Sequence, residues 1–477
     1  MTTYEAVIGL ETHVQLNTIT KIFCSCKADS WQMPPNSNIC PVCTGLPGVL
    51  PVLNKTVVEK GVRLAAAMNS RINDVSFFDR KNYFYPDLPK GYQITQYDVP
   101  IAEGGYLDFP VADGGTRRVR LRKMHLEEDA GKTRLEGNLR YVDFNRCGVP
   151  LIEIVTEPDL RSAEDTAQYL IRLRQLLRWL DLSEANMERG QMRCDANISI
   201  RPVGSDGLNT KTEIKNVNSI DAIQSAIANE IKRQIREVQA GNAIHPWTLD
   251  WDDNAGVLRM MRSKETEADY RYFREPDLLP VRLTPGWKQA ILEQMPELPL
   301  QRRQRFMDEY ALPEYDSDIL TSERSLSNYF EETVRLYAGD PKKVSNWLMN
   351  DVLRLLNEKN IMADQLHLTP VYLADILKMV DQKSINTNTG KTLLVKVEES
   401  FRTPAEIVKA EGLVQVSDDH AIRLICETVL SENPSEVESY RAGKTTLLGW
   451  FVGQVMRKSG GKVNPNLARG IMEELLK

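Results

Sequence analysis

The sequence predicts an α+β protein in which a large antiparallel sheet is followed by helices. Before residue 295, stretches that alternate polar and apolar residues recur, as strands with one buried face do. From about residue 296 the apolar residues follow a helical period instead. A chain of 477 residues is too long for one core. We therefore expect a sheet domain at residues 1–294, an all-helical domain at 295–403 and a small helical tail domain at 404–477.

The clearest alternation lies in the first strand, residues 7–16. Its polar side carries Glu11, His13 and Gln15, and the residues between them are apolar or Thr. An ordinary amphipathic strand looks the same. However, a carboxylate and an imidazole two positions apart on one face can converge on a single cation. Because the pattern recurs in later strands, we interpret this face as a candidate site.

Composition sets the protein class. The chain is 42% hydrophobic and 26% charged, and no apolar run approaches the ~20 residues that span a bilayer. The first strand begins almost at once, which leaves no room for a signal peptide. We expect a cytoplasmic protein without a membrane partner. A net charge of −6 argues against nonspecific coating of nucleic acid, but not against a local basic patch.

Two close thiol pairs follow the first strand, Cys24/Cys26 and Cys40/Cys43. Four thiolates on turn-rich sequence suit a tetrahedral Zn²⁺, which would be structural because no coordination position stays open. The first pair is spaced more tightly than the usual knuckle, so free thiols are the alternative.

A helix over residues 55–68, capped by Asn54, precedes a segment without a clean period, residues 78–93. This segment interleaves aromatic residues with Arg80, Lys81 and Lys90. Such a mixture offers stacking and phosphate contacts. A surface loop packed by its own aromatics explains it equally well.

Residues 118–129 and 149–157 are the next strands. In the first, alternation places His125 and Glu127 on one face of the strand and Glu128 on the other. A β-bulge would exchange these faces. In the second, Glu153 is a lone charge among Leu, Ile and Val. Such a carboxylate is expensive to bury unless it is paired or bound to a metal.

Helices at residues 162–180 and 219–239 flank two further strands, 193–201 and 211–216. These strands supply the candidate phosphate- and ATP-binding residues Arg193, Lys211 and Lys215. Carboxylates for Mg²⁺ beside bases for phosphate oxygens are what phosphoryl transfer from ATP requires. The sequence has no Walker A loop and no Rossmann glycine fingerprint.

The C-terminal helices are polarised in charge. Residues 405–440 hold eight acids against Lys409 and Arg423, whereas residues 441–472 hold six bases and no acid. We interpret this basic half as a nucleic-acid face, with a merely solvated face as the alternative. The candidate tRNA-binding residues are Lys444, Arg457, Lys458 and Lys462.

Five motifs resemble the B subunits of the glutamyl/aspartyl-tRNA amidotransferase: GLETHVQL (9–16), HLEEDAGK (125–132), GVPLIEIV (148–155), MRCDAN (192–197) and TEIKN (212–216). The resemblance covers the whole chain. It departs at residues 245–250, where the family more often has an Arg-containing segment, and we expect a local loop to differ there.

The resemblance implies a cradle domain related to the catalytic sheet of glutamine synthetase, a helical domain and a tail that contacts tRNA. It implies an ATP-dependent reaction in which the side-chain carboxylate of Glu-tRNA(Gln) or Asp-tRNA(Asn) is phosphorylated and then converted to the amide by ammonia. It also implies a heterotrimer with an amidase, the A subunit, and with a small C subunit. The family's Mg²⁺ residues correspond to Glu11, His13, Glu127 and Glu153, with Glu128 competing with Glu127. Its Zn²⁺ residues correspond to the four cysteines.

Two other functions remain open from the sequence. A zinc-bearing tRNA-binding scaffold would have no chemistry of its own, and the isolated Glu153 tells against it. A free-standing small-molecule amide ligase would leave the basic tail unexplained. The sequence does not decide whether Gln-tRNA, Asn-tRNA or both are made, nor how ammonia arrives.

Overall fold

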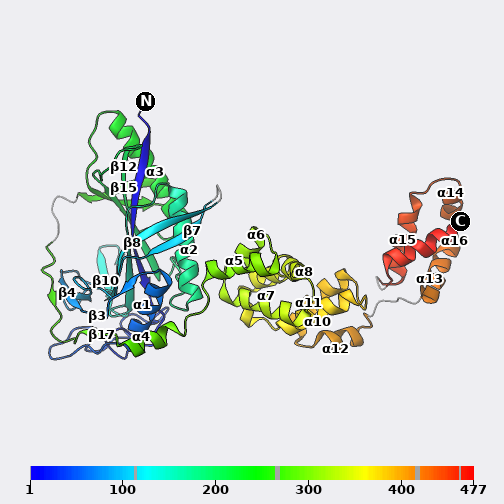
Figure 1. Ribbon diagram of the computed structural model, residues 1–477, viewed down its shortest axis with the longest axis horizontal. Helices are drawn as coiled ribbons and strands as arrows, with labels where there is room; N and C mark the ends of the chain where they lie inside the picture. Colours follow the sequence, from blue (N-terminus) through cyan, green and yellow to red (C-terminus); the bar gives the residue numbers. More distant parts are fainter. Residues whose placement is uncertain (1, 112–114, 264–268, 414–418, 461–462) are drawn as a thin grey trace. The chain divides into compact units, whose positions relative to one another are not determined.

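A computed structural model describes residues 2–111, 115–263, 269–413, 419–460 and 463–477 (Figure 1). The chain divides into two compact units, Met1–Leu298 and Pro299–Lys477. The first unit is a sheet with covering helices, and the second is helical. No described helix is long and apolar enough to cross a membrane.

One mixed sheet dominates the first unit. In spatial order its main path is β15 (Val257–Ser263), β14 (Trp247–Asp252), β13 (Thr212–Lys215), β12 (Met192–Pro202), β1 (Tyr4–Gln15), β11 (Pro150–Thr156), β8 (Thr116–Glu128), β5 (Tyr92–Thr95), β4 (Asp79–Asn82) and β16 (Phe273–Arg274). Three strands join off this path: β2 (Arg71–Ile72), β6 (Ala102–Glu103) and β7 (Tyr106–Pro110). Two small pairs stand apart: β9 (Lys132–Glu136) with β10 (Leu139–Asp143), and β3 (Val75–Ser76) with β17 (Val281–Arg282).

The prediction of a purely antiparallel sheet is wrong at one pair. Strands β13 and β14 run parallel, with Glu213 opposite Thr248. The long helix α3 (Ile220–Gln239) and the segment after it return the chain to the same end of the sheet, so β14 enters in the direction of β13. Strand β14 begins at Trp247, within residues 245–250, where we expected a local loop to differ from the family. Likewise, residues 78–93 contain β4 and the start of β5, which the aperiodic sequence did not indicate.

The central strand β1 has one buried and one partly open face. Leu10, Thr12 and Val14 are buried, and they alternate with the polar residues of the opposite face. The helices α1 (Lys55–Ala67), α2 (Ala163–Trp179) and α3 contribute apolar residues to the same core. Ser162 and Ser219 cap α2 and α3 by accepting hydrogen bonds from the backbone N–H groups of Asp165 and Ala222. The helices therefore leave the other face of β1 free to carry polar chemistry.

The first unit also contains α4 (Pro285–Leu292). The second unit contains α5 (Pro299–Tyr310), α6 (Glu314–Leu320), α7 (Arg324–Tyr337), α8 (Pro341–Trp347), α9 (Leu353–Lys359), α10 (Pro370–Asp381), α11 (Thr387–Ser400), α12 (Pro404–Ala410), α13 (Asp419–Glu432), α14 (Pro434–Arg441), α15 (Leu447–Lys458) and α16 (Pro465–Leu476). A π-helical turn, Leu348–Val352, lies between α8 and α9. The described residues of this unit form two hydrophobic cores, one from residues 306–408 and one from residues 422–476.

Candidate functional site

Three residues on three neighbouring strands form a row across the polar face of the main sheet. His13 of β1 lies opposite Glu153 of β11, and Glu153 lies opposite His125 of β8. The Oε2 atom of Glu153 lies 3.2 Å from Nε2 of His13 and 3.1 Å from Nε2 of His125. Strand pairing thus places one carboxylate between two imidazoles that come from distant parts of the sequence.

Glu127 of β8 completes this group. Its buried carboxylate lies 3.7 Å from Nε2 of His13 and 3.5 Å from Nε2 of His125, and the hydroxyl of Thr95 donates to it at 3.2 Å. One donor atom from each of His13, Glu127 and Glu153 lies within 4.8 Å of the other two. We call His13, His125, Glu127 and Glu153 the carboxylate–imidazole cluster.

The cluster is electrostatically self-balanced. Burial raises the pKa of Glu153, but the two imidazoles outweigh burial and hold that pKa well below its usual range. Burial lowers the pKa of both histidines, and the facing carboxylates outweigh it, so the pKa of His13 is raised and that of His125 reaches about 9. A divalent cation would displace such protons. The two carboxylates suit Mg²⁺, which usually binds through one or two carboxylates and keeps several waters.

The two other predicted metal residues lie outside this group of three donor atoms. Glu11 accepts a hydrogen bond of 3.0 Å from the amide of Asn197. Glu128 is buried, forms an ion pair with Lys90 and accepts a 3.0 Å hydrogen bond from the backbone N–H of Ile94. Of the two adjacent glutamates, Glu127 is therefore the one beside His13.

The predicted phosphate-binding residues differ in their surroundings. Arg193, which lies opposite His13 on β12, contacts Asp129 at 2.8 Å. Burial raises the pKa of Asp129, but Arg193 and Arg146 outweigh it and lower that pKa. On β13, Lys215 forms ion pairs with Asp195 and, at 3.4 Å, with Glu213. Lys211 is exposed and precedes β13.

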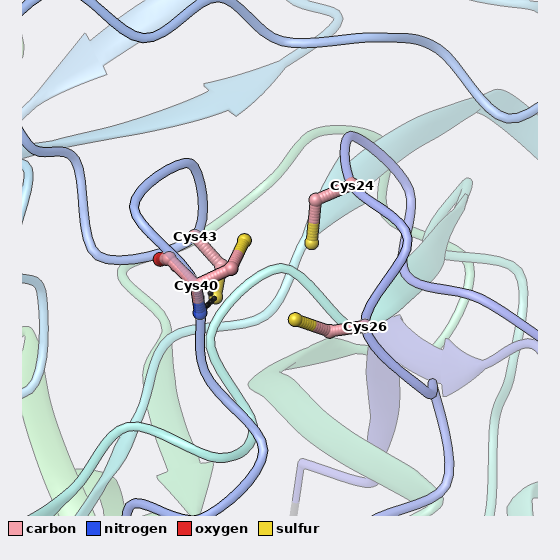
Figure 2. A group of neighbouring side chains, drawn as sticks. All are labelled: Cys24, Cys26, Cys40 and Cys43. Atoms are coloured by element: carbon pink, nitrogen blue, oxygen red, sulfur yellow. Dashed lines mark hydrogen bonds between the residues drawn. The ribbon is translucent and has the colours of Figure 1, made fainter.

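The four cysteines converge from two loops, and their thiols point toward a common centre (Figure 2). All four are free, and their Sγ atoms lie within 4.8 Å of one another. Four Zn–S bonds of ~2.3 Å place the sulfurs about 3.8 Å apart, so this arrangement fits Zn²⁺. The backbone N–H of Cys40 donates to Sγ of Cys43 at 3.2 Å. Contact with the Cys24 thiol lowers the pKa of Cys43 to about 5, despite its burial.

The predicted tRNA-binding residues lie around α15. Lys444 is exposed before that helix, and Arg457 and Lys458 are exposed in its last turn. Lys458 forms an ion pair with Glu432 of α13. Lys462 lies outside the described residues.

A model of the GatB/GatE catalytic domain matches residues 6–289, which hold the carboxylate–imidazole cluster and the four cysteines. The chain belongs to this family. A second model, the GatB domain, matches residues 328–476 in the helical unit. Family membership therefore extends over both units.

Full-length relatives share one name. The chain is 49% identical to the B subunit of aspartyl/glutamyl-tRNA(Asn/Gln) amidotransferase from Thermodesulfovibrio yellowstonii, with 99% of each chain covered. It is 47% identical to the protein of that name from Persephonella marina and 48% identical to that of Moorella thermoacetica, each over 99% of this chain and all of the relative. The predicted family is thereby confirmed.

Sequence reasoning missed two residues that the structure brings to the site. His125 shared a parity with Glu127, but nothing in the sequence indicated that it pairs with Glu153. Asp129 ended an acidic run, and its neighbours Arg193 and Gln15 belong to other strands. The sequence showed only that these residues lie in alternating strands. Which residues of other strands they contact depends on strand register, which alternation does not give.

Proposed function

We propose that this chain is the B subunit of an aspartyl/glutamyl-tRNA(Asn/Gln) amidotransferase and carries its ATP-dependent step. The relatives' names support the assignment. The observation that carries the site assignment is the carboxylate–imidazole cluster, in which Glu127 and Glu153 converge with His13 on the polar face of the sheet. When a carboxylate attacks ATP, cations must screen the phosphates and charge must be positioned at the leaving oxygen. The polar face supports this chemistry, because its carboxylates could hold a cation and Arg193 and Lys215 could contact phosphate oxygens.

The reaction has two steps. A side-chain carboxylate oxygen of Glu-tRNA(Gln) or Asp-tRNA(Asn) attacks the γ-phosphorus of ATP, and ADP leaves with the bridging electron pair. Ammonia then attacks the acyl carbon, phosphate leaves, and a proton is released to give Gln-tRNA(Gln) or Asn-tRNA(Asn). When bound, Mg²⁺ would screen the phosphates and orient the γ-phosphate for in-line attack.

We assign roles to residues within this scheme. His13, Glu127 and Glu153 would hold Mg²⁺, with Glu11 close by on the same strand as His13. Arg193 and Lys215 would bind phosphate oxygens through charge-assisted hydrogen bonds. Their contacts with Asp129 and Asp195 support these roles, because a carboxylate partner holds a long basic side chain in place before the substrate arrives.

The wider assembly is also a proposal. An amidase, the A subunit, would release ammonia from glutamine, a small C subunit would complete a cytoplasmic heterotrimer, and the tail at residues 404–477 would bind tRNA. The sheet domain, residues 1–294, would be a cradle related to the catalytic sheet of glutamine synthetase, and residues 295–403 a separate helical domain. The four cysteines would hold a structural Zn²⁺.

The test supplies the reconstituted complex with ATP, Glu-tRNA(Gln) and ammonium chloride in place of glutamine. We expect ADP and Gln-tRNA(Gln) in equal amounts, and the same with Asp-tRNA(Asn). A complex that binds tRNA without forming ADP would be the scaffold of the alternative hypothesis. Amidation of free glutamate without tRNA would instead indicate a small-molecule ligase.

A further inference from the structure

A fully buried lysine lies beside the four cysteines. The side chain of Lys21 is 0% exposed in the loop that follows β1. Its ammonium donates to the backbone carbonyl of Asn38 at 2.9 Å and to Sγ of Cys43 at 3.7 Å. A buried ammonium costs several kcal/mol unless an anion compensates it.

The carbonyl of Asn38 carries no charge, so of these two partners only Cys43, as a thiolate, can compensate the ammonium. Four cysteine thiolates around Zn²⁺ leave the centre with a net charge of about −2. The buried cation and this centre therefore compensate each other.

We propose that Lys21 is a positioning residue of the four-cysteine metal centre: its ammonium neutralises thiolate charge at Cys43, and the bound metal in turn stabilises the buried lysine. The inference rests on Zn²⁺ binding by these cysteines and is independent of the amidation reaction. Hydrogen bonds to ligand atoms from outside the first shell commonly tune metal affinity.

The packing around Lys21 decides which substitution isolates its charge. The aliphatic stem is packed: the position that a Cβ atom would take on Gly148 lies 3.6 Å from Cδ of Lys21 and 3.5 Å from Cβ of Cys43. The backbone N–H of Ile22, next along the loop, donates to the carbonyl of Gly148 at 2.9 Å. Truncation to Ala would open a cavity here, whereas Met preserves an unbranched stem and removes only the ammonium.

Lys60 offers a matched control. This second buried lysine, 8% exposed, donates to Oδ1 of Asn17 at 2.6 Å and to the backbone carbonyl of Asp181. Its partners are amide oxygens, as one partner of Lys21 is, but no thiol is among them. Lys60→Met therefore removes a buried ammonium without touching the metal centre.

The experiment compares full-length wild-type chain, Lys21→Met and Lys60→Met, each loaded with Zn²⁺ and each stripped by a chelator under reducing conditions. Competition with a chromophoric chelator gives Zn²⁺ affinity, and thermal unfolding gives Tm. We expect Lys21→Met to bind Zn²⁺ roughly 10- to 100-fold more weakly, and Lys60→Met to match wild type within about threefold. Stripping the metal should lower Tm more in wild type and Lys60→Met than in Lys21→Met, because a metal stabilises the folded chain more where it binds more tightly.

Equal Zn²⁺ affinity and an equal drop in Tm for Lys21→Met and wild type would overturn the proposal and leave Lys21 an ordinary structural lysine. So would a wild-type chain that binds no added Zn²⁺. If Lys21→Met does not fold, Lys21→Arg and Lys21→Gln replace it. The Arg variant keeps the charge and should hold Zn²⁺ at least about tenfold more tightly than the Gln variant, and equal affinities would refute the idea. Because none of these measurements uses tRNA or ATP, their failure is distinct from failure of the proposed reaction.

Discussion

Replacing Glu153 by Gln tests the proposed site most directly. The change preserves side-chain volume and removes one negative charge from a position 3.2 Å from His13 and 3.1 Å from His125. Glu153 is only 14% exposed, so little solvent screens the loss. The strand should still form, because Gln fits the same position and can accept a hydrogen bond from one imidazole.

The structure sets the expected magnitude. A hydrogen bond to a charged group contributes ~1.5–3 kcal/mol. Since 1.36 kcal/mol corresponds to a factor of ten, loss of the charge should weaken divalent-cation binding roughly 10- to 100-fold. Amide formation should fall by a factor of about 10² or more, as it does when a charge-stabilising contact to a transition state is removed.

Two assays check these values. Calorimetric titration of the purified chain with Mn²⁺ measures cation affinity, and the reconstituted complex with ammonium chloride measures Gln-tRNA(Gln) formation at saturating ATP. Glu398→Gln is the control, because Glu398 is buried in the helical unit and paired with Lys359 at 2.7 Å. It should alter stability but not Mn²⁺ affinity. A Glu153→Gln variant that keeps activity within a few-fold of wild type would refute the assignment.

Three further predictions follow from charge. Because a histidine must be deprotonated to bind a cation, the raised pKa of His13 implies that Mn²⁺ affinity falls by up to ~10-fold per pH unit as pH decreases below that pKa; calorimetry at several pH values checks this, and a flat profile would contradict it. The lowered pKa of Asp129 contributes stability that is present above the unfolded-state pKa and lost as pH falls through the folded-state pKa. Asp129→Asn should therefore cost ~1–3 kcal/mol of unfolding free energy at pH 7, and urea titrations should find that difference shrinking in acid. In the tail, joint replacement of Lys444, Arg457 and Lys458 by Ala should lower both the affinity for tRNA and its salt dependence. Filter-binding assays at several salt concentrations measure both.

The sequence was informative where structure depends on local periodicity. Alternation in residues 7–16 indicated which residues share a face of β1, and the helices expected at residues 162–180 and 219–239 agree with α2 and α3 to within one residue at each end. Alternation cannot tell which strands pair. His13 of β1 lies opposite Glu153 of β11, 140 positions later, and Glu153 lies opposite His125 of β8, 28 positions earlier. The contact between His125 and Glu153 was missed for this reason, since only register places the two residues opposite each other. The parallel pairing of β14 with β13 could not be predicted either, because it also depends on contacts between separate parts of the chain.

The acidic run at the end of β8 explains why the sequence left Glu127 and Glu128 as competing ligands. Successive residues of a strand point to opposite faces, so adjacent glutamates must separate. Glu127 faces His13, whereas Glu128 pairs with Lys90 and lines a cavity of about 200 Å³ whose wall includes Cys24 and Cys43. A shift of one residue in the register of β8 would exchange the two environments.

The run therefore connects two parts of the unit that the sequence presents as unrelated motifs. One glutamate belongs to the proposed reaction face, and its neighbour belongs to the side where the four cysteines lie. Gly148 lies between Glu128 and the cysteine loop, since a Cβ atom there would lie 3.9 Å from Oε2 of Glu128 and 3.5 Å from Cβ of Cys43. Its backbone N–H donates to the carbonyl of Asp129 at 3.0 Å, and its φ of +81° favours glycine. A side chain at this position would strain the turn and press on the cysteine loop at once, so the close approach of the cysteine loop to the end of β8 depends on glycine.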